Sequence, residues 1–320
     1  MLLSLTRRLI ATSSWTKHFS MAPAVMAGMA IGRNQVCAVV LDANGGKHEV
    51  RGIYTQDMPV PLFAEQPAEA IEAGLVDALH AVSDKFREEF ASVRVALPDT
   101  VIRSTVFDLD ALPKTADMRG ALLRWRFAKE WQRPEDSLDC CGFDLGEDRN
   151  KRLFFGQAGD RPWLDSVRRA LVQAGIVPWS LNAAAIYRFN YFHDAIAGDG
   201  GALLSLDPDC WNLLLWDDKG RVRRVFTRLR ENLAAENEAA SIADEVERAI
   251  FSHVQGDGNR RVDKLYLVGC NTEMAAFAEI FDGRLSGRIV QLHADEGITG
   301  TFAGMRDGLA PLALAAALST

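Results

Sequence analysis

Two short segments carry residues whose spacing suits phosphate binding. The first is IGRNQVCAVVLDANGGK, residues 31–47, and the second is LDPDCWNLLLWDDKGR, residues 206–221. In each segment an apolar strand ends in a tight polar turn, and such a turn can direct backbone N–H groups at a phosphate. A phosphate loop uses glycine because the backbone must approach the ligand closely. Gly32 meets this requirement in the first turn, whereas Asp207 stands at the corresponding place in the second.

The acidic residues of the second turn disfavour a polyphosphate. Asp207 and Asp209 would both place a negative charge beside it. Two unit charges about 4 Å apart repel each other by about 4 kcal/mol at an effective dielectric constant near 20. One alternative stays open, because a shift of the alignment by one or two residues would make Asp207 or Asp209 a carboxylate that holds a metal ion.

Other signatures of catalysis or metal binding are missing from the sequence. The odd number of cysteines, five, argues against a disulfide framework, and their spacing matches no zinc motif. Cys37, Cys210 and Cys270 fall in the nucleotide-type segments, where we interpret them as small buried apolar residues rather than as a thiol cluster. The histidines are scattered, and no P-loop or nucleophile-elbow motif is present. The sequence therefore predicts no catalytic residue and no metal site.

Charge and hydrophobicity exclude two further classes. The chain has 320 residues and a net charge of -7, with no block of Lys and Arg, which disfavours nucleic-acid binding. No apolar run reaches the roughly 18 residues that a transmembrane helix needs. Residues 1–27 form an N-terminal extension with three open interpretations: a signal-peptide-like segment, a dispensable extension with Met21 as the true start, or an amphipathic segment at a membrane surface.

The elements that must position the two turns alternate between strands and helices. We expect strands at 93–98 and 101–107 and helices at 66–90, 232–254, 272–281 and 304–318. Between them, residues 109–180 read as a compact helix–strand–strand–helix insertion. In its first helix, which Pro134 ends, we expect Met118, Leu122 and Trp125 to point inward, together with Phe127 or Trp131. Alternating strands and helices indicate an α/β protein.

The two hairpins are related by an internal repeat. Gly32 and Asp207 lie 175 positions apart, and so do Asp42 and Asp217. Each hairpin opens one half of the α/β chain, so the halves are predicted to be duplicated lobes that face each other across a cleft. This arrangement is that of the actin-like ATPases.

Within that superfamily, the chain resembles the PilM-like proteins of type IV pilus assembly, whose relatives include MshI, the cytoplasmic part of GspL and FtsA. The resemblance runs from about residue 29 to 318. It rests on MAIGRNQVCAVVL, ALPDTVIRSTVFDLDALP, LLRWRFAKEWQRPEDSLDCCGFDL, SVRRALVQAGIVPWSLNAAAIYRF and LYLVGCNTEMAAF. It implies an α/β, duplicated actin-like (ribonuclease H-like) fold of two lobes with an inserted small α+β subdomain. The expected division is 28–108 for the first lobe, 109–180 for the insertion and 181–320 for the second lobe with the C-terminal helix.

The resemblance also implies where a nucleotide would bind. The corresponding residues are Gly32, Asn34, Ser205, Asp207, Asp209, Gly269 and Asn271. Several family residues are replaced, because Ala30 stands for the Mg²⁺-associated Asp, Cys37 for a Lys and Cys270 for the second Gly of the adenosine loop. We therefore expect a degenerate cleft without catalysis and without a resident cofactor, with ATP and Mg²⁺ as the ligands if any bind.

The family's function gives the expected partner. It implies a cytoplasmic scaffold, peripheral to the inner membrane, that binds the tail of a PilN-like bitopic membrane protein in a pilus or secretion platform. In the family that tail docks between the main lobe and the insertion. Trp125, Trp131, Trp163 and Trp179 either fill the core or line such an apolar groove. The basic run RVRRVFTRLRENL is interpreted as a solvated edge strand rather than a surface for an acidic partner.

Three alternatives from other classes remain at this stage. One is a nucleotide-binding actin-like ATPase, and another is a small-molecule kinase of the same superfamily, which would need a catalytic carboxylate in the cleft. The third is a filament former similar to FtsA.

Overall fold

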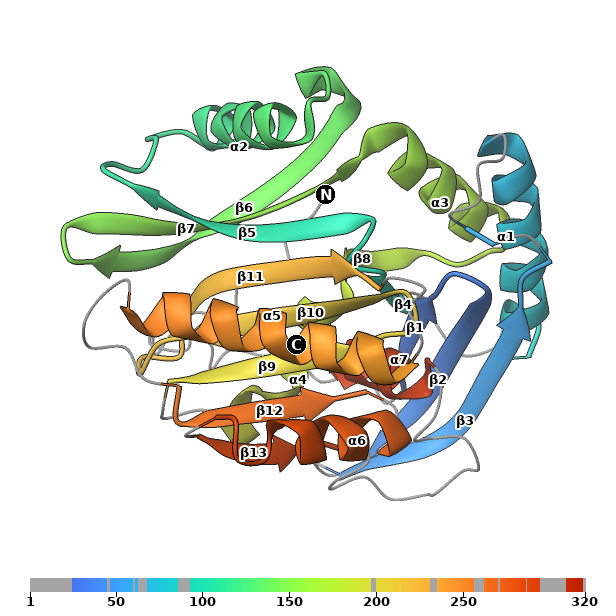
Figure 1. Cartoon of the computed structure of the whole chain (residues 1–320). Helices are drawn as coiled ribbons and strands as arrows, with labels where there is room; N and C mark the ends of the chain where they lie inside the picture. The colour runs from blue at the N-terminus through green and yellow to red at the C-terminus, as the bar shows by residue number, and fades with distance from the viewer. Residues whose placement is uncertain are drawn as a thin grey trace.

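The computed structural model describes residues 25–44, 47–59, 61–62, 68–85, 93–196, 200–230, 235–255, 262–269, 271–285, 287–293 and 309–318. Its strands form two five-stranded sheets and one three-stranded sheet (Figure 1). The predicted N-terminal extension lies outside the described residues as far as residue 24, and its last three residues belong to the first strand.

The two large sheets have the same strand order. The first runs β3-β2-β1-β4-β8, with β1 Val25–Ile31, β2 Gln35–Asn44, β3 Lys47–Asp57, β4 Val93–Leu97 and β8 Pro178–Ala183. The second runs β11-β10-β9-β12-β13, with β9 Gly201–Leu206, β10 Cys210–Trp216, β11 Val222–Leu229, β12 Lys264–Val268 and β13 Arg288–Gln291. In both sheets the hairpin strands pair antiparallel and the next two strands are parallel. The predicted duplication is therefore confirmed.

The register of the repeat is also confirmed. Ile31 pairs with Val36, and Leu206 pairs with Trp211 at the matching place of the second sheet. The turn that follows is closed by a backbone hydrogen bond from Gly32 to Gln35 (2.8 Å) in one lobe. The same bond runs from Asp207 to Cys210 (2.9 Å) in the other. Gly32 and Asp207 thus occupy equivalent positions.

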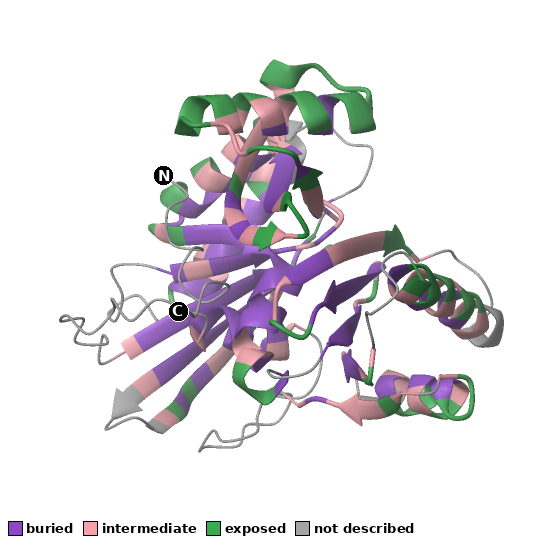
Figure 2. Ribbon diagram, turned by 90° about the vertical axis from the view of Figure 1, so that its left-hand side faces the viewer, coloured by how far each residue is buried: buried purple, intermediate pink, exposed green. Residues whose placement is uncertain are grey.

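Helices cover both sheets (Figure 2). These are α1 Ala68–Ser83, α4 Ala184–Ile196, α5 Ala235–Gln255, α6 Asn271–Phe281 and α7 Ala310–Leu318. The helix predicted at 66–90 is confirmed for α1, which ends at Ser83 before a turn. The helix predicted at 304–318 is observed from Ala310, and residues 301–308 lie outside the described part.

The chain divides between the lobes differently from the sequence-based expectation. Strand β8 pairs with β4 and so completes the first sheet, and α7 packs on β1, β2 and β4 of that same sheet. The expected division assigned α7 to the second lobe and split β8 equally between the insertion and the second lobe. The reason is visible at Gly28, where a Cβ would lie 2.1 Å from the carbonyl oxygen of Ala313, so α7 fits directly onto β1. The apolar sequence of a helix predicts that the helix is buried, but it does not predict which sheet the helix packs against.

The insertion contains the third sheet, in the order β5-β7-β6. Its elements are β5 Ile102–Leu109, α2 Ala116–Trp131, a 3₁₀ turn Glu135–Ser137, β6 Leu138–Asp148, β7 Lys151–Asp160 and α3 Arg161–Gln173. Strand β5 pairs along its whole length with β7, so this sheet begins at Ile102, before the expected boundary at 109. Helix α2 covers one face of the sheet, and α3 leads back to pack against α1 (Figure 1).

The inward face of α2 differs in part from the predicted one. Phe127 is buried, and Leu122 and Trp131 pack against the same core, as expected. Met118 and Trp125, however, are 57% and 46% exposed, and Leu123 is buried in their place. Leu123 fits there because β6 and β7 have glycines beneath it: a Cβ at Gly156 would lie 2.6 Å from its Cδ2 atom. Apolar residues occur on both faces of α2, so the helical spacing does not predict which face is buried.

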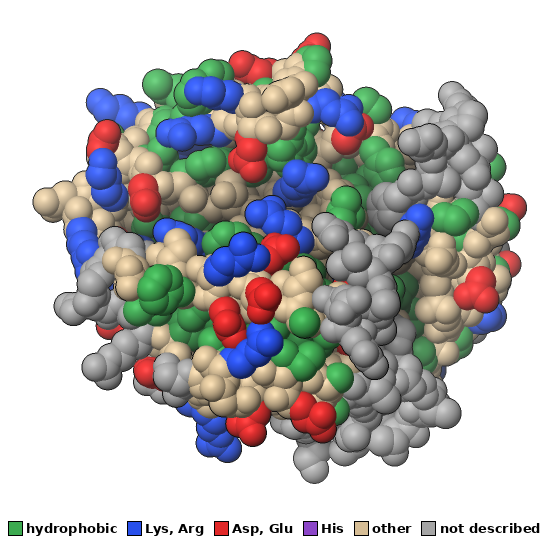
Figure 3. Space-filling model, in the orientation of Figure 1, with side chains coloured by type: hydrophobic (Ala, Val, Ile, Leu, Met, Phe, Trp, Pro, Cys, Tyr) green, Lys and Arg blue, Asp and Glu red, His purple; other side chains and the backbone are tan. Residues whose placement is uncertain are grey.

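Figure 3 shows hydrophobic and basic side chains together along the upper edge, where Figure 1 places α2.

Candidate functional site

The turns of the two hairpins line one cavity between the lobes. Its volume is about 230 Å³. The first turn contributes residues 32–35 and the second contributes residues 207–210. The guanidinium of Arg33 lies 3.5 Å from the carboxylate of Asp209, which links the two turns directly. Apolar walls complete the cavity: Ile31, Pro98, Ala184, Pro208, Leu309 and Leu312.

The structure brings four of the seven predicted cleft residues into this cavity. They are Gly32, Asn34, Asp207 and Asp209. Ser205 is buried in β9, and its hydroxyl has no hydrogen-bond partner among the described residues. Gly269 follows β12, where a Cβ would lie 2.8 Å from the carbonyl oxygen of Leu206. Asn271 is the first residue of α6, and its side chain lies outside the described part of the structure.

Asp207 does not present a free negative charge to the cavity. Its two carboxylate oxygens accept hydrogen bonds from the two terminal nitrogens of Arg188, at 2.7 and 2.5 Å. The side chains of Arg188 and Asp207 are only 8% and 15% exposed. Paired in this bidentate way, the carboxylate is neutralised by the guanidinium. An ion pair therefore occupies the second turn, in place of the bare negative charge of Asp207 that the sequence predicted.

A third charged residue, Asp99, joins this pair from the first sheet. It follows β4 and is 1% exposed. Its carboxylate accepts hydrogen bonds from the backbone N–H of Ala185, at 3.2 and 3.1 Å, and so caps the first turn of α4. Burial, reinforced by the charge of Asp207 and opposed by that of Arg188, raises the pKa of Asp99 to about 7. Asp99, Arg188 and Asp207 form a charge cluster that joins the two sheets through α4.

Sequence reasoning missed Arg188, which binds Asp207, and Asp99, whose pKa both of them shift. Arg188 is the one charged residue in the apolar run AAAIYRFNYF, and a lone charge on a buried helix requires a partner. Asp99 directly follows a buried parallel strand, and α/β proteins place functional groups at the carboxyl ends of such strands. These signals mark the two residues as constrained, but neither signal identifies the partner.

Apolar and uncharged groups also contribute to the cleft, which Gln35 and Asp57 line as well. Leu309 covers the first turn, because a Cβ at Gly32 would lie 2.8 Å from its Cδ1 atom. Burial raises the pKa of Cys37 to about 11, and burial also raises the pKa of Cys210. Both thiols therefore stay protonated at neutral pH, as their interpretation as small apolar residues requires. Within the described ranges, no group of three metal-ligating side chains comes together.

The basic run after the second hairpin is not a solvated strand throughout, which corrects the sequence interpretation. Arg221 and Arg223 bind Asp148 of the insertion, the first of them at 3.1 Å. Arg221 also bonds Asp217 at 2.8 Å. Although burial alone would raise the pKa of Asp148, hydrogen bonds and the charges of Arg223 and Arg221 hold it below its usual range. Strand β11 thereby fastens the second lobe to the insertion.

A second cavity lies between the first lobe and the insertion. Its volume is about 430 Å³, and it opens between α1 and α3. Leu62, Leu75, Trp163 and Val167 give it apolar walls. The guanidinium of Arg169 on α3 bonds the carboxylate of Glu72 on α1 at 2.9 Å. This cavity lies where the resemblance predicted a groove for a partner segment.

The four tryptophans of the insertion and its exit have different roles. Trp131 packs on Phe127, with ring centroids 5.4 Å apart, as core filling requires. Trp163 is partly buried and lines the α1–α3 cavity. Trp125 and Trp179 are 46% and 57% exposed. Neither of these two lines a cavity described here.

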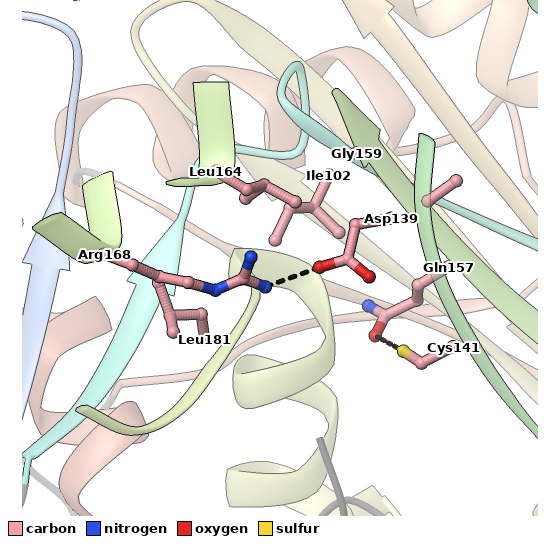
Figure 4. A pocket seen from close by; sticks show the side chains of 9 residues that line it. Ile102, Asp139, Cys141, Gln157, Gly159, Leu164, Arg168 and Leu181 are labelled. Carbon is pink, nitrogen blue, oxygen red and sulfur yellow. Dashed lines mark hydrogen bonds and ion pairs between the residues drawn. The ribbon is translucent and has the colours of Figure 1, made fainter. Parts of the chain in front are cut away.

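A third cavity, of about 20 Å³, lies beneath the insertion sheet (Figure 4). Arg168 bonds Asp139 at 2.5 Å on one side of it, and Cys141 approaches Gln157 at 3.7 Å on the other. This volume holds one water molecule and no larger ligand. It is therefore part of the packing between α3 and the insertion sheet.

None of the described helices is long and apolar enough to cross a membrane. No protein-family model matches the chain, and no curated protein matches it. Solved structures, in contrast, match the chain. The chain resembles PilM in a PilM–PilN type IV pilus biogenesis complex, with 14% identity, a TM-score of 0.72 and coverage of 91% of this chain and 97% of that chain.

Two further structures are similar over nearly the whole chain. One is a Bacteroides thetaiotaomicron protein with actin-like ATPase fold and unknown function (10% identity, TM-score 0.56, 91% and 95% covered). The other is the cytoplasmic domain of EpsL, an inner-membrane component of the type II secretion system of Vibrio cholerae (13% identity, TM-score 0.52, 92% and 95% covered). The chain therefore has the actin-like ATPase fold that its duplicated hairpins predicted, and its structure resembles PilM, as its sequence motifs indicated.

Proposed function

We propose that this chain is a non-catalytic scaffold on the cytoplasmic side of an inner-membrane platform that assembles type IV pilus-like fibres or secretes proteins. On this proposal it binds the cytoplasmic tail of a PilN-like membrane protein. The observation that carries the proposal is the likeness to PilM, at a TM-score of 0.72 over 91% of this chain. The EpsL cytoplasmic domain adds support, because it too comes from an inner-membrane machine.

The α1–α3 cavity is the proposed docking site of the tail. It lies between the first lobe and the insertion and offers apolar walls of a size that receives one or two large side chains. The Glu72–Arg169 ion pair supplies polar groups beside those walls. Buried apolar anchors surrounded by polar contacts are the usual source of affinity in such interfaces.

Calorimetric titration with a synthetic peptide tests the docking site. The peptide carries the cytoplasmic tail of the PilN-like protein of the same organism. Trp163→Ala removes an apolar wall and is expected to weaken binding at least about tenfold, the range of a truncated interface anchor. Trp125→Ala makes the same chemical change on α2, away from the cavity, and is expected to leave the affinity unchanged. Equal affinity of both variants, or no binding by the unaltered chain, would contradict the docking site.

The cleft between the lobes is proposed to be a degenerate nucleotide site. Three observations support this: Leu309 covers Gly32, Ala30 stands where the family has an Asp, and Arg188 with Asp207 occupies the second turn. Titration of the full chain with ATP and Mg²⁺ is expected to give no saturable heat. Micromolar affinity for ATP would contradict this part of the proposal.

A second candidate function, a small-molecule kinase, is favoured by one observation. Asp99 follows Pro98, which lines the cleft, and its pKa of about 7 suits a general base. Against this, the carboxylate is buried and engaged by Ala185. The test is release of ADP from ATP in the presence of candidate sugars. Turnover that is lost in Asp99→Asn would establish the kinase and overturn the non-catalytic scaffold.

A further inference from the structure

Helix α2 has an apolar outer face that no other described element covers. We call the side chains of Met118, Trp125, Arg126 and Lys129 the α2 outer face. Their spacing of three, four and seven residues places them on one side of the helix. Met118 and Trp125 are among the most exposed large hydrophobic residues of the described chain, although the opposite face of α2 already supplies a complete core contact through Leu123 and Phe127.

Basic residues lie beside the apolar side chains of the α2 outer face. The helix contains Arg119, Arg124, Arg126 and Lys129 against Asp117 and Glu130, in a chain whose net charge is -7. The guanidinium of Arg126 and the ammonium of Lys129 lie over the Trp125 ring, 5.5 and 5.7 Å from its centroid. Cations on long aliphatic stems beside a Trp ring are the arrangement of side chains at a membrane–water interface.

The shape of this part of the molecule fits a flat partner. Both ribbon views place α2 at the edge of the molecule, outside the insertion sheet (Figures 1 and 2). None of the three cavities described above is lined by an α2 residue. A convex helix without a groove suits a planar fluid surface better than a peptide, which needs a concave site to bury its side chains.

We propose that the α2 outer face rests on a bilayer that contains anionic lipids. Trp125 and Met118 enter the headgroup region, and Arg126 and Lys129 meet the lipid phosphates. This contact does not depend on the proposed tail-binding function. It is compatible with that function, because α2 and the contact of α3 with α1 both lie in the upper half of Figure 1.

Co-sedimentation with vesicles tests the proposal on the full chain. We expect binding to vesicles of phosphatidylglycerol and phosphatidylcholine and much weaker binding to phosphatidylcholine alone. High salt should weaken the binding, because it screens the attraction. The variants Met118→Ser with Trp125→Ser, and Arg126→Glu with Lys129→Glu, should each lower the partition coefficient at least about tenfold. Phe251→Ser is the matched control, since Phe251 is 63% exposed on α5, and should bind as the unaltered chain does.

Three outcomes would overturn the proposal. The first is that the full chain does not bind phosphatidylglycerol vesicles. The second is that binding is the same in both α2 variants, which would place the lipid contact elsewhere in the chain. The third is that sedimentation velocity shows a dimer that the α2 variants dissociate, without vesicle binding, which would assign the face to a second copy. Unchanged thermal unfolding of all variants shows that the effects are local.

Discussion

The carboxylate of Asp207 stands where a phosphate loop has glycine, and the guanidinium of Arg188 binds it with two hydrogen bonds. A largely buried ion pair of this kind contributes little net stability, because the cost of desolvating both charges offsets their attraction. Removing one partner is expensive, however, because the other is left buried without compensation. Asp207→Ala is for this reason a poor probe of nucleotide binding, since it perturbs folding first.

The pair predicts a non-additive double-mutant cycle. Arg188→Met and Asp207→Leu are each expected to lower the free energy of unfolding by about 3 kcal/mol. The double variant should lose clearly less than the sum, because neither charge then remains. Urea unfolding of the four proteins measures the coupling. Strict additivity of the two losses would contradict the ion pair.

Asp99 predicts a pH dependence of stability. Its pKa is raised to about 7 in the folded chain, above the value near 3.9 in an unfolded one. Between these values the folded state holds the extra proton, so the contribution of Asp99 to stability falls as the pH rises from about 4 to 7. The loss amounts to about 4 kcal/mol at most.

The comparison with Asp99→Asn isolates that contribution. The amide keeps an acceptor for the N–H of Ala185 but does not titrate. The difference in unfolding free energy between this variant and the unaltered chain should grow in favour of Asn from pH 4 to pH 8. Parallel pH curves for the two proteins would show that Asp99 has an ordinary pKa.

Among the elements, α7 shows the closest approach to a sheet. Gly28 on β1 faces the backbone of α7, and a Cβ there would lie 2.1 Å from the oxygen of Ala313 and 2.3 Å from the nitrogen of Ala317. Neither atom can move without the whole helix. The contact explains why the C-terminal helix belongs to the first sheet, and why β1 has a glycine at this position.

Two glycine-to-alanine substitutions test this contact. Gly28→Ala should displace α7 and lower the unfolding free energy by more than about 2 kcal/mol, in the range of overpacked cores. Gly120→Ala lies in α2, where the nearest atom to a new Cβ is the tip of Arg124 at 3.5 Å. It should raise stability by up to about 1 kcal/mol, the difference in helix propensity. Equal effects in thermal unfolding would mean that α7 does not pack on β1 as described.

At the scale of the whole molecule, the insertion is held from two sides. Helix α3 packs on α1 of the first lobe, and Asp148 at the end of β6 binds Arg221 and Arg223 of the second lobe. The proposed tail site lies on the first of these contacts. Apolar packing of α3 on α1 holds the insertion to the first lobe, and the contact of β5 with β11 together with these charged contacts holds it to the second.

Asp148→Asn is expected to loosen the insertion from the second lobe. The loss of a hydrogen-bonded charge partner for two arginines should cost about 2 kcal/mol. Faster amide exchange in β11 and in the β6–β7 hairpin would report it. Asp110→Asn is the matched control, because Asp110 pairs with Lys151 in the same subdomain but is exposed, and it should leave exchange unchanged. Unchanged exchange in β11 after Asp148→Asn would contradict the link between the second lobe and the insertion.

The local sequence pattern was enough to specify most of the elements, although not α4, and also the repeat of 175 residues and the pairing within each hairpin. Period and turn chemistry act over a few residues and can be recognised without the fold. The repeat also predicted that Gly32, Asn34, Asp207 and Asp209 lie together in the cleft, because duplicated hairpins must present equivalent turns.

Contacts between distant segments settled the rest. They determine which sheet β5, β8 and α7 each join, which face of α2 is buried and which arginine neutralises Asp207. Hydrophobic burial is non-directional, so an apolar face indicates that it will be covered but not by what. An ion pair likewise needs two side chains in one place, and only the folded chain brings Arg188, Asp99 and Asp207 together.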